Sequence, residues 1–289
     1  MARVVFTLAV MSIFACAANA AEAATIPDFS GIWGRNSLDY EPPASGPGPV
    51  MNTTHSFFKR MGDYTNPILK PESAARVKAG GELSAKGKNF PTPSSLCWPM
   101  SPPFIWRIPG LQVLQEPNKV TLLYLNDHHV RHIRLNAQHP AHLTPSWSGD
   151  SIGHYESDTL VVDTVGIKVG PYSMTDNYNS PQSEALHVVE RFRLIDGGAA
   201  KKAAEQSERD SGRVEAERGG LTIDPDYKGR GLQVHITVED PNVFTMPWSA
   251  QVTYRRVKDE WEERVCADNP HDYSSGTDTP VPQADRPDF

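Results

Sequence analysis

Histidine and carboxylate side chains that could move protons gather near the middle of the chain. His154 and Glu156 alternate along the segment that leads into an apolar run at 160–162, and Asp163 ends that run. A carboxylate inside an apolar segment needs a partner or a function, because burying a bare charge is costly. An imidazole within reach of a carboxylate can act as a general acid or base near neutral pH. These residues are therefore candidates for proton transfer, although a turn at 158–159 that caps a hairpin would also explain the pattern.

A second group of ionisable residues lies between residues 183 and 195. Strand alternation puts His187 and Arg191 on one face and Glu190 on the other, so each face mixes apolar and charged side chains. In a barrel with a ligand cavity, such groups project into the lumen and orient a substrate. His187 with Arg191, or Glu190 with Asp163, would form such groups, and a buried salt bridge between strands is the structural alternative. The catalytic candidates are His187, Asp163, Glu190 and His154.

Other polar and aromatic side chains are candidates for holding a ligand. They are Arg191, Arg131, His132, Glu156, Trp147 and Trp248. Tryptophan at a barrel mouth can contact an apolar ligand, but packing in the core is its commoner use.

The motifs of metal and cofactor sites are missing from the sequence. Five histidines fall between 128 and 142, but no His-Glu-x-x-His or Cys-x-x-Cys motif accompanies them. We expect turn and surface histidines there and no metal site. The sequence also lacks a Gly-x-Ser-x-Gly elbow, a dinucleotide fingerprint and a phosphate loop, so we expect neither a serine nucleophile nor a cofactor.

Strands must position these candidates. Runs of β-branched and apolar residues, bounded by Asn, Asp, Gly or Pro, are typical of strands joined by short turns. They lie at 105–108, 110–115, 120–125, 130–135, 159–169, 186–195, 232–238, 249–257 and 260–266, with a further start at 32–33. The pattern predicts a mainly β protein, an antiparallel meander closed or nearly closed into a barrel, because closure removes exposed edges.

Irregular segments flank and interrupt this predicted barrel. Proline and glycine punctuate residues 37–95, which predicts a long irregular wrap with a short helix at 71–79. Residues 197–231 predict an exposed helical excursion, a solvated insertion or a lid. Residues 269–289 predict a loose tail. The remaining chain, 21–268, is long enough for a single β domain.

The N-terminus and the cysteines predict a secreted protein. Residues 1–20 have the charge, apolar run and small-residue cleavage site of a signal peptide, although Cys16 leaves a lipoprotein as an alternative. Cys97 and Cys266 remain after cleavage and predict a disulfide in an oxidising compartment, with unpaired thiols or a metal pair as alternatives. The net charge of -7 does not favour nucleic-acid binding, and no later segment predicts a membrane span. We expect a periplasmic or secreted protein; the sequence leaves the oligomeric state open.

The chain resembles an uncharacterised family of secreted bacterial proteins with a lipocalin-like or calycin-like barrel. The residues that carry the resemblance are the Pro-Asp-Phe-Ser-Gly-x-Trp start at 27–33 and the Gly-x-Ser-Ile-Gly-His-x-Glu-x-Asp-Thr-Leu-Val-Val-Asp-Thr core at 149–164. The likeness extends through 184–192 and 240–248 to Cys266, and 197–231 departs from it as an insertion. The resemblance implies secretion and a single β domain, and it implies no particular activity.

Together these features predict a protein that acts on a small organic molecule. We expect a cofactor-independent lyase, isomerase or hydrolase that uses His and carboxylate acid–base chemistry in a barrel cavity. A non-catalytic carrier or sensor of a hydrophobic small molecule is the alternative.

Overall fold

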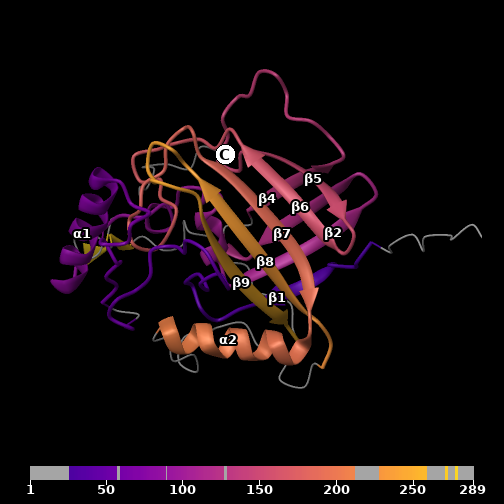
Figure 1. The fold of residues 1–289 in the computed structure, drawn as a ribbon, viewed down its shortest axis with the longest axis horizontal. Coiled ribbons are helices and arrows are strands. Elements are labelled where there is room, and N and C mark those ends of the chain that lie inside the picture. The colour runs from indigo at the N-terminus through magenta and orange to yellow at the C-terminus, as the bar shows by residue number, and fades with distance from the viewer. Residues whose placement is uncertain are drawn as a thin grey trace, which may run out of the picture.

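Nine strands close into a barrel (Figure 1). The computed structural model describes residues 26–56, 59–88, 90–126, 129–211 and 228–258, and two short strands beyond them. The barrel strands are β1 (Gly31–Gly34), β2 (Gly110–Glu116), β3 (Lys119–Tyr124), β4 (Val130–Leu135), β5 (Asp150–Glu156), β6 (Thr159–Val165), β7 (His187–Ile195), β8 (Gly231–Glu239) and β9 (Trp248–Arg256). A separate two-stranded sheet pairs β10 (His271–Asp272) with β11 (Thr277–Asp278). The predicted mainly β barrel is confirmed.

One neighbouring pair of strands in the barrel is parallel. Each strand pairs antiparallel with the next, and β9 pairs antiparallel with β1, but β4 and β5 run in the same direction. An odd number of strands cannot alternate in direction all the way round a closed barrel, so one parallel pair is required. Residues 136–149 connect these two strands and are long enough for the crossover of about a dozen residues that a parallel pair needs. The predicted antiparallel meander therefore has one exception.

Two predicted elements differ from the structure. The run at 105–108 is not a strand, because Phe104–Arg107 form a 3-10 helix, η2, that directly follows Pro102 and Pro103. Its apolar residues are buried, so the pattern of a short buried run fits either element. No strand is predicted between 135 and 159, but residues 150–156 form the strand β5, in which Gly153 packs close to Ile133 and needs no side chain there.

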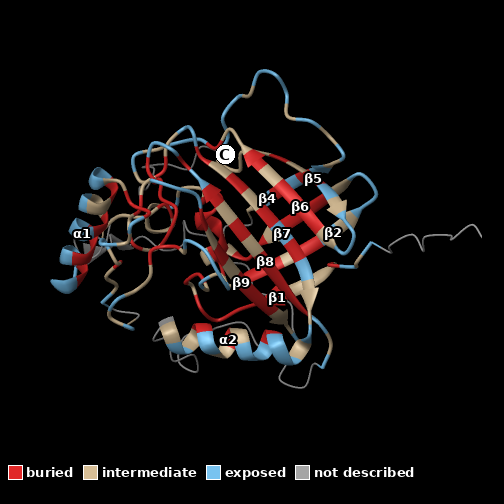
Figure 2. Ribbon diagram, in the orientation of Figure 1, coloured by how far each residue is buried: buried red, intermediate tan, exposed pale blue. Residues whose placement is uncertain are grey.

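The barrel interior is a packed core. Trp106 from η2 lies edge-on to Tyr124, Phe192 and Tyr254, with ring centroids 5.9, 5.6 and 6.3 Å away. None of these four side chains is more than 1% exposed. Figure 2 shows the buried positions running along the strands. In the described part of the chain, these rings occupy the space in which a ligand lumen was expected.

The predicted wrap and excursion cover the outside of the barrel. In the wrap, Glu41 pairs with Gln251 of β9, and the helix α1 (Pro71–Ala85) extends beyond the predicted 71–79. A short 3-10 helix, η1 (Ser94–Leu96), follows it. The predicted excursion contains the helix α2 (Gly197–Ser211), which packs on β8 and β9 (Figure 1). Ala200 and Ala204 of α2 are buried at this contact.

Several predictions concern residues outside the described ranges. These are the signal peptide at 1–20, the strand at 260–266, most of the tail at 269–289, His128 and Cys266. Cys97 is disulfide-bonded, and its pairing with Cys266 stays a prediction. Where the structure describes the chain, no helix is long and apolar enough to cross a membrane.

Candidate functional site

Asp163 and His187 meet on the outer face of the barrel wall. On β6, the side chains of Leu160, Val162 and Thr164 point inward and are buried, so alternation turns Asp163 outward. Asp163 lies opposite Val189 of β7, which makes His187 its diagonal neighbour. His187 Nε2 lies 3.0 Å from Asp163 Oδ2. The wall therefore brings together two of the four catalytic candidates, in a pairing that differs from His187 with Arg191 and Glu190 with Asp163.

The crossover between β4 and β5 adds a second imidazole to this pair. His139 Nε2 lies 3.0 Å from the other oxygen of Asp163, and His139 Nδ1 lies 2.5 Å from Asp150 Oδ2. Arg134 Nη2 donates to both oxygens of Asp150 at 2.8 Å. We call Arg134, His139, Asp150, Asp163 and His187 the His–Asp cluster. The sequence assigns His139 to turn and surface histidines, because no local motif reveals where a long crossover returns to the barrel.

The electrostatics of the cluster favour a protonated histidine beside an ionised carboxylate. The hydrogen bond to Asp163 raises the pKa of His187 above 6.5, and the charges of Asp163 and Glu239 add to this effect against the opposing effect of burial. The hydrogen bonds from His187 and His139 lower the pKa of Asp163, although burial opposes them. The side chains of His187 and Asp163 are 35% and 39% exposed, so a molecule from solvent can reach them.

The two histidines differ in which ring nitrogens are engaged. Both nitrogens of His139 face a carboxylate oxygen. His187 uses Nε2 for Asp163, and its Nδ1 has no hydrogen-bond partner among the described residues. Since Asp163 orients the ring, Nδ1 of His187 is the position that can exchange a proton with a bound molecule. His139 instead positions the two carboxylates.

Glu190 and Arg131 form a buried ion pair inside the barrel. Arg131 Nη1 and Nη2 donate to the two oxygens of Glu190 at 2.8 and 2.5 Å, and the side chains are 1% and 0% exposed. Trp106 Nε1 also donates to Glu190 at 2.7 Å. Burial alone would lower the pKa of Arg131, but the charge of Glu190, its hydrogen bonds and the neighbouring Tyr124 together outweigh burial and raise that pKa. Glu190 therefore does not meet Asp163, which lies on the opposite face of the wall, and the alternative of a buried salt bridge describes this position.

The remaining polar candidates form separate surface contacts. His154 Nε2 lies 3.1 Å from Glu156 Oε1, and Arg191 Nη1 donates to Glu156 Oε2 at 2.7 Å. Arg191, and then His154, lowers the pKa of Glu156 through these hydrogen bonds. Arg191 therefore pairs with Glu156 rather than with His187. His132 is exposed and contacts Thr121 at 3.1 Å.

The two candidate tryptophans occupy different environments. Trp248 is 1% exposed and packs against Tyr40 and Phe244, with ring centroids 5.8 and 5.7 Å away, so it belongs to the core. Trp147 is half-buried, lies 5.6 Å from Trp98, and precedes β5 at the same end of the barrel as Asp150. Trp147 therefore offers an aromatic surface beside the strand that carries part of the His–Asp cluster.

Comparisons with known proteins identify no relative. The chain matches no family model, no curated protein and no solved structure. Among the residues that the structure places, no group of three or more His, Cys, Asp and Glu fits a metal ion. The geometry of the site is thus the basis for any assignment of function.

Proposed function

We propose that this protein is an enzyme that transfers protons to and from a small organic molecule at the His–Asp cluster. The observation that carries the proposal is the 3.0 Å contact between Asp163 and His187, in which one carboxylate orients an imidazole on an accessible face. This arrangement is typical of general acid–base catalysis, which typically contributes about 10²- to 10⁴-fold to a rate. The reaction classes that need only such a step are those of a cofactor-independent lyase, isomerase or hydrolase.

His187 is the residue that exchanges the proton. Its raised pKa keeps a larger fraction protonated near neutral pH than a free imidazole would have, so it starts the reaction as a general acid. Asp163 stabilises the imidazolium, and His139 holds Asp163 and Asp150 in place. Trp147 supplies an aromatic surface on which an organic substrate can pack.

A deuterium-exchange assay tests the proposal without knowledge of the substrate. The mature protein is incubated in D₂O with mixtures of small organic acids, sugars and aromatic compounds, and mass spectrometry detects compounds that gain deuterium or change mass. We expect His187→Gln and Asp163→Asn to abolish the changes that the wild-type protein causes. His235→Gln is the matched control, because His235 is also half-buried on the outer face but lies outside the cluster. Full exchange by His187→Gln would refute the proposed role of His187.

The proposal includes secretion. The predicted signal peptide at 1–20 and the predicted Cys97–Cys266 disulfide both suit the periplasm or the extracellular space. Expression of the full sequence in a bacterial host, followed by mass measurement of the periplasmic protein, should give a chain that begins at Ala21. Recovery of only the uncleaved chain from the cytoplasm would contradict this part of the proposal.

A further inference from the structure

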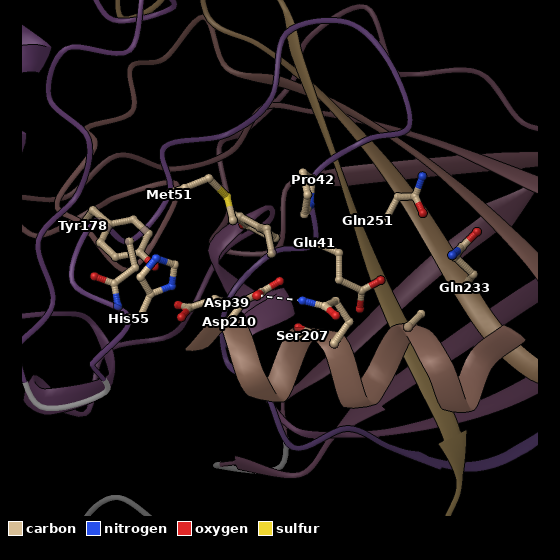
Figure 3. Close-up of a pocket in the computed structure, with 14 residues that line it drawn as sticks. Asp39, Glu41, Pro42, Met51, His55, Tyr178, Ser207, Asp210, Gln233 and Gln251 are labelled. Atoms are coloured by element: carbon tan, nitrogen blue, oxygen red, sulfur yellow. Dashed lines mark hydrogen bonds between the residues drawn. The ribbon is translucent and has the colours of Figure 1, made fainter. Parts of the chain in front are cut away.

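A cavity of about 490 Å³ lies outside the barrel, between α2, the outer faces of β8 and β9, and the N-terminal wrap (Figure 3). Small-molecule sites usually have volumes of about 300–1,000 Å³, so this cavity is large enough for a small ligand. Its polar lining consists mainly of carboxylates and amides, from Asp39, Glu41, Asp210, Gln206, Gln233 and Gln251. The cavity is separate from the His–Asp cluster, which lies over β4 to β7.

Two buried polar atoms of lining residues have no hydrogen-bond partner. Asp39 Oδ1 accepts a hydrogen bond from Asn177 at 2.9 Å, but Oδ2 has no partner, and the side chain is only 8% exposed. The hydroxyl of Tyr178 also lacks a partner, and this residue is 4% exposed. Buried polar groups are normally paired, so two orphans beside one cavity indicate contacts that a ligand would complete.

The orphan atoms lie in a common electrostatic environment. Burial, and then the charge of Asp39, raises the pKa of Tyr178 well above its usual value. The charge of Arg60 opposes this shift, and the closeness of the hydroxyl to the Asp39 carboxylate adds to it. The Tyr178 hydroxyl therefore stays neutral, and its oxygen can accept a hydrogen bond. The charge of Asp39 also acts on Asp176, whose pKa burial raises to about 6. A positive group placed at Asp39 would offset the effect of its negative charge on Tyr178 and on Asp176.

The charge of the lining favours a cation. Among the described residues, no lysine or arginine lines the cavity. Arg35 approaches Glu41, and Arg60 approaches Asp39, only to 3.8 Å. Both oxygens of Glu41 already accept hydrogen bonds from Thr253, at 2.8 and 2.6 Å. Asp210 accepts a hydrogen bond from Gln206 through Oδ1, at 2.8 Å. Among the lining carboxylates that the structure describes, Asp39 has the buried oxygen without a partner, Oδ2.

We propose that this cavity binds a small organic cation, a primary amine or a guanidinium compound, whose charged group donates hydrogen bonds to Asp39 Oδ2 and the Tyr178 hydroxyl oxygen. Gln251 projects from β9 into the lining and supplies an amide contact to the remainder of the ligand. Gln233 of β8 also lines the cavity, but its amide is already hydrogen-bonded to Arg193 and Thr253. Tyr40, Pro42 and Met51 supply apolar surface for its carbon chain. Anions are excluded by the surrounding carboxylates.

Calorimetric titration of the full mature protein tests this site. The probes are putrescine and agmatine as cations, 1,4-butanediol as a neutral molecule of the same length as putrescine, and succinate as an anion. We expect only the two cations to bind. Asp39→Asn retains the contact to Asn177 but removes the charge, so it should weaken their binding by about tenfold or more, since charge-assisted hydrogen bonds are the strong ones. Tyr178→Phe should weaken binding by a smaller factor.

The control is Glu82→Gln, which removes the same charge from an exposed position on α1. It should bind the cations as the wild type does. Equal loss in Glu82→Gln and Asp39→Asn would mean that the amines respond only to net charge, and this would overturn the proposal. Absence of binding by both cations, or equal binding of butanediol, would also overturn it. If Asp39→Asn fails to fold, Tyr178→Phe decides, because it removes a hydroxyl that has no partner, and unchanged affinity in this variant refutes the site.

Discussion

The buried pair of Arg131 and Glu190 gives the sharpest test of which residues hold the barrel together. Glu190→Gln preserves the shape of the side chain and an oxygen for Trp106, but it leaves the charge of Arg131 buried without a counter-charge. Removing one partner of such a pair costs about 3–5 kcal/mol in the free energy of unfolding. We expect the lower end, about 3 kcal/mol, because Gln keeps part of the hydrogen bonding. In a domain of this size, that loss lowers the melting temperature by about 6–12 °C.

A double-mutant cycle measures the coupling. Arg131→Met should destabilise by a similar amount, because it leaves the carboxylate of Glu190 alone in the core. The double variant Arg131→Met/Glu190→Gln should be more stable than either single variant, since neither charge remains. Denaturant unfolding followed by tryptophan fluorescence and far-UV circular dichroism gives the four free energies. A loss below about 1 kcal/mol in Glu190→Gln, or losses that simply add in the double variant, would refute the reasoning.

Three further predictions concern pH and backbone geometry. Burial raises the pKa of Asp176 from 3.8 to about 6, so the wild-type protein is most stable below pH 3.8 and loses stability as the pH rises through 6. Asp176→Asn has no such loss, so its free energy of unfolding relative to wild type should increase by about 3 kcal/mol between pH 3.5 and 8. Denaturant unfolding across pH measures this difference. Asp163 raises the pKa of His187, so this pair contributes stability below pH 6.5 that is lost as the pH rises above 6.5. His187→Gln should abolish this pH-dependent part of the free energy of unfolding, which amounts to less than about 1 kcal/mol because the pair is partly exposed. Gly149 has φ +67°, and an added Cβ would lie 2.8 Å from Thr164 Cγ2. Gly149→Ala should therefore lower the free energy of unfolding by about 1–3 kcal/mol. An unchanged melting temperature would contradict this geometry.

The sequence predicts the barrel well where strands are long and bounded by turn residues. Residues 110–135 form three successive antiparallel strands, as their alternation and their turns indicate. The run at 105–108 is too short for periodicity to separate a strand from a 3-10 turn. β5 is harder to predict for another reason. Its Gly153 would usually weaken a strand, but here Ile133 of β4 fills the space beside it.

The candidate site is only partly predictable from the sequence. Alternation within β7 correctly separates His187 from Glu190, but it does not say which face is inward, because both faces mix apolar and charged residues. The inward face is decided by Arg131, which lies on a distant strand and pairs with Glu190 across the core. A contact of this kind depends on barrel closure and has no signature in local spacing.

The His–Asp cluster depends on the same feature that closes the barrel. Nine strands require one parallel pair, and a parallel pair requires a connection that returns along the outside of the wall. The connection at 136–149 carries His139 to Asp150 and Asp163, which alternation turns outward on β5 and β6. An even-numbered meander would need no such crossover, and its outer wall would carry Asp163 and His187 without the second imidazole. The packed interior therefore provides stability, and the crossover between the parallel strands β4 and β5 completes the candidate site on the outer surface.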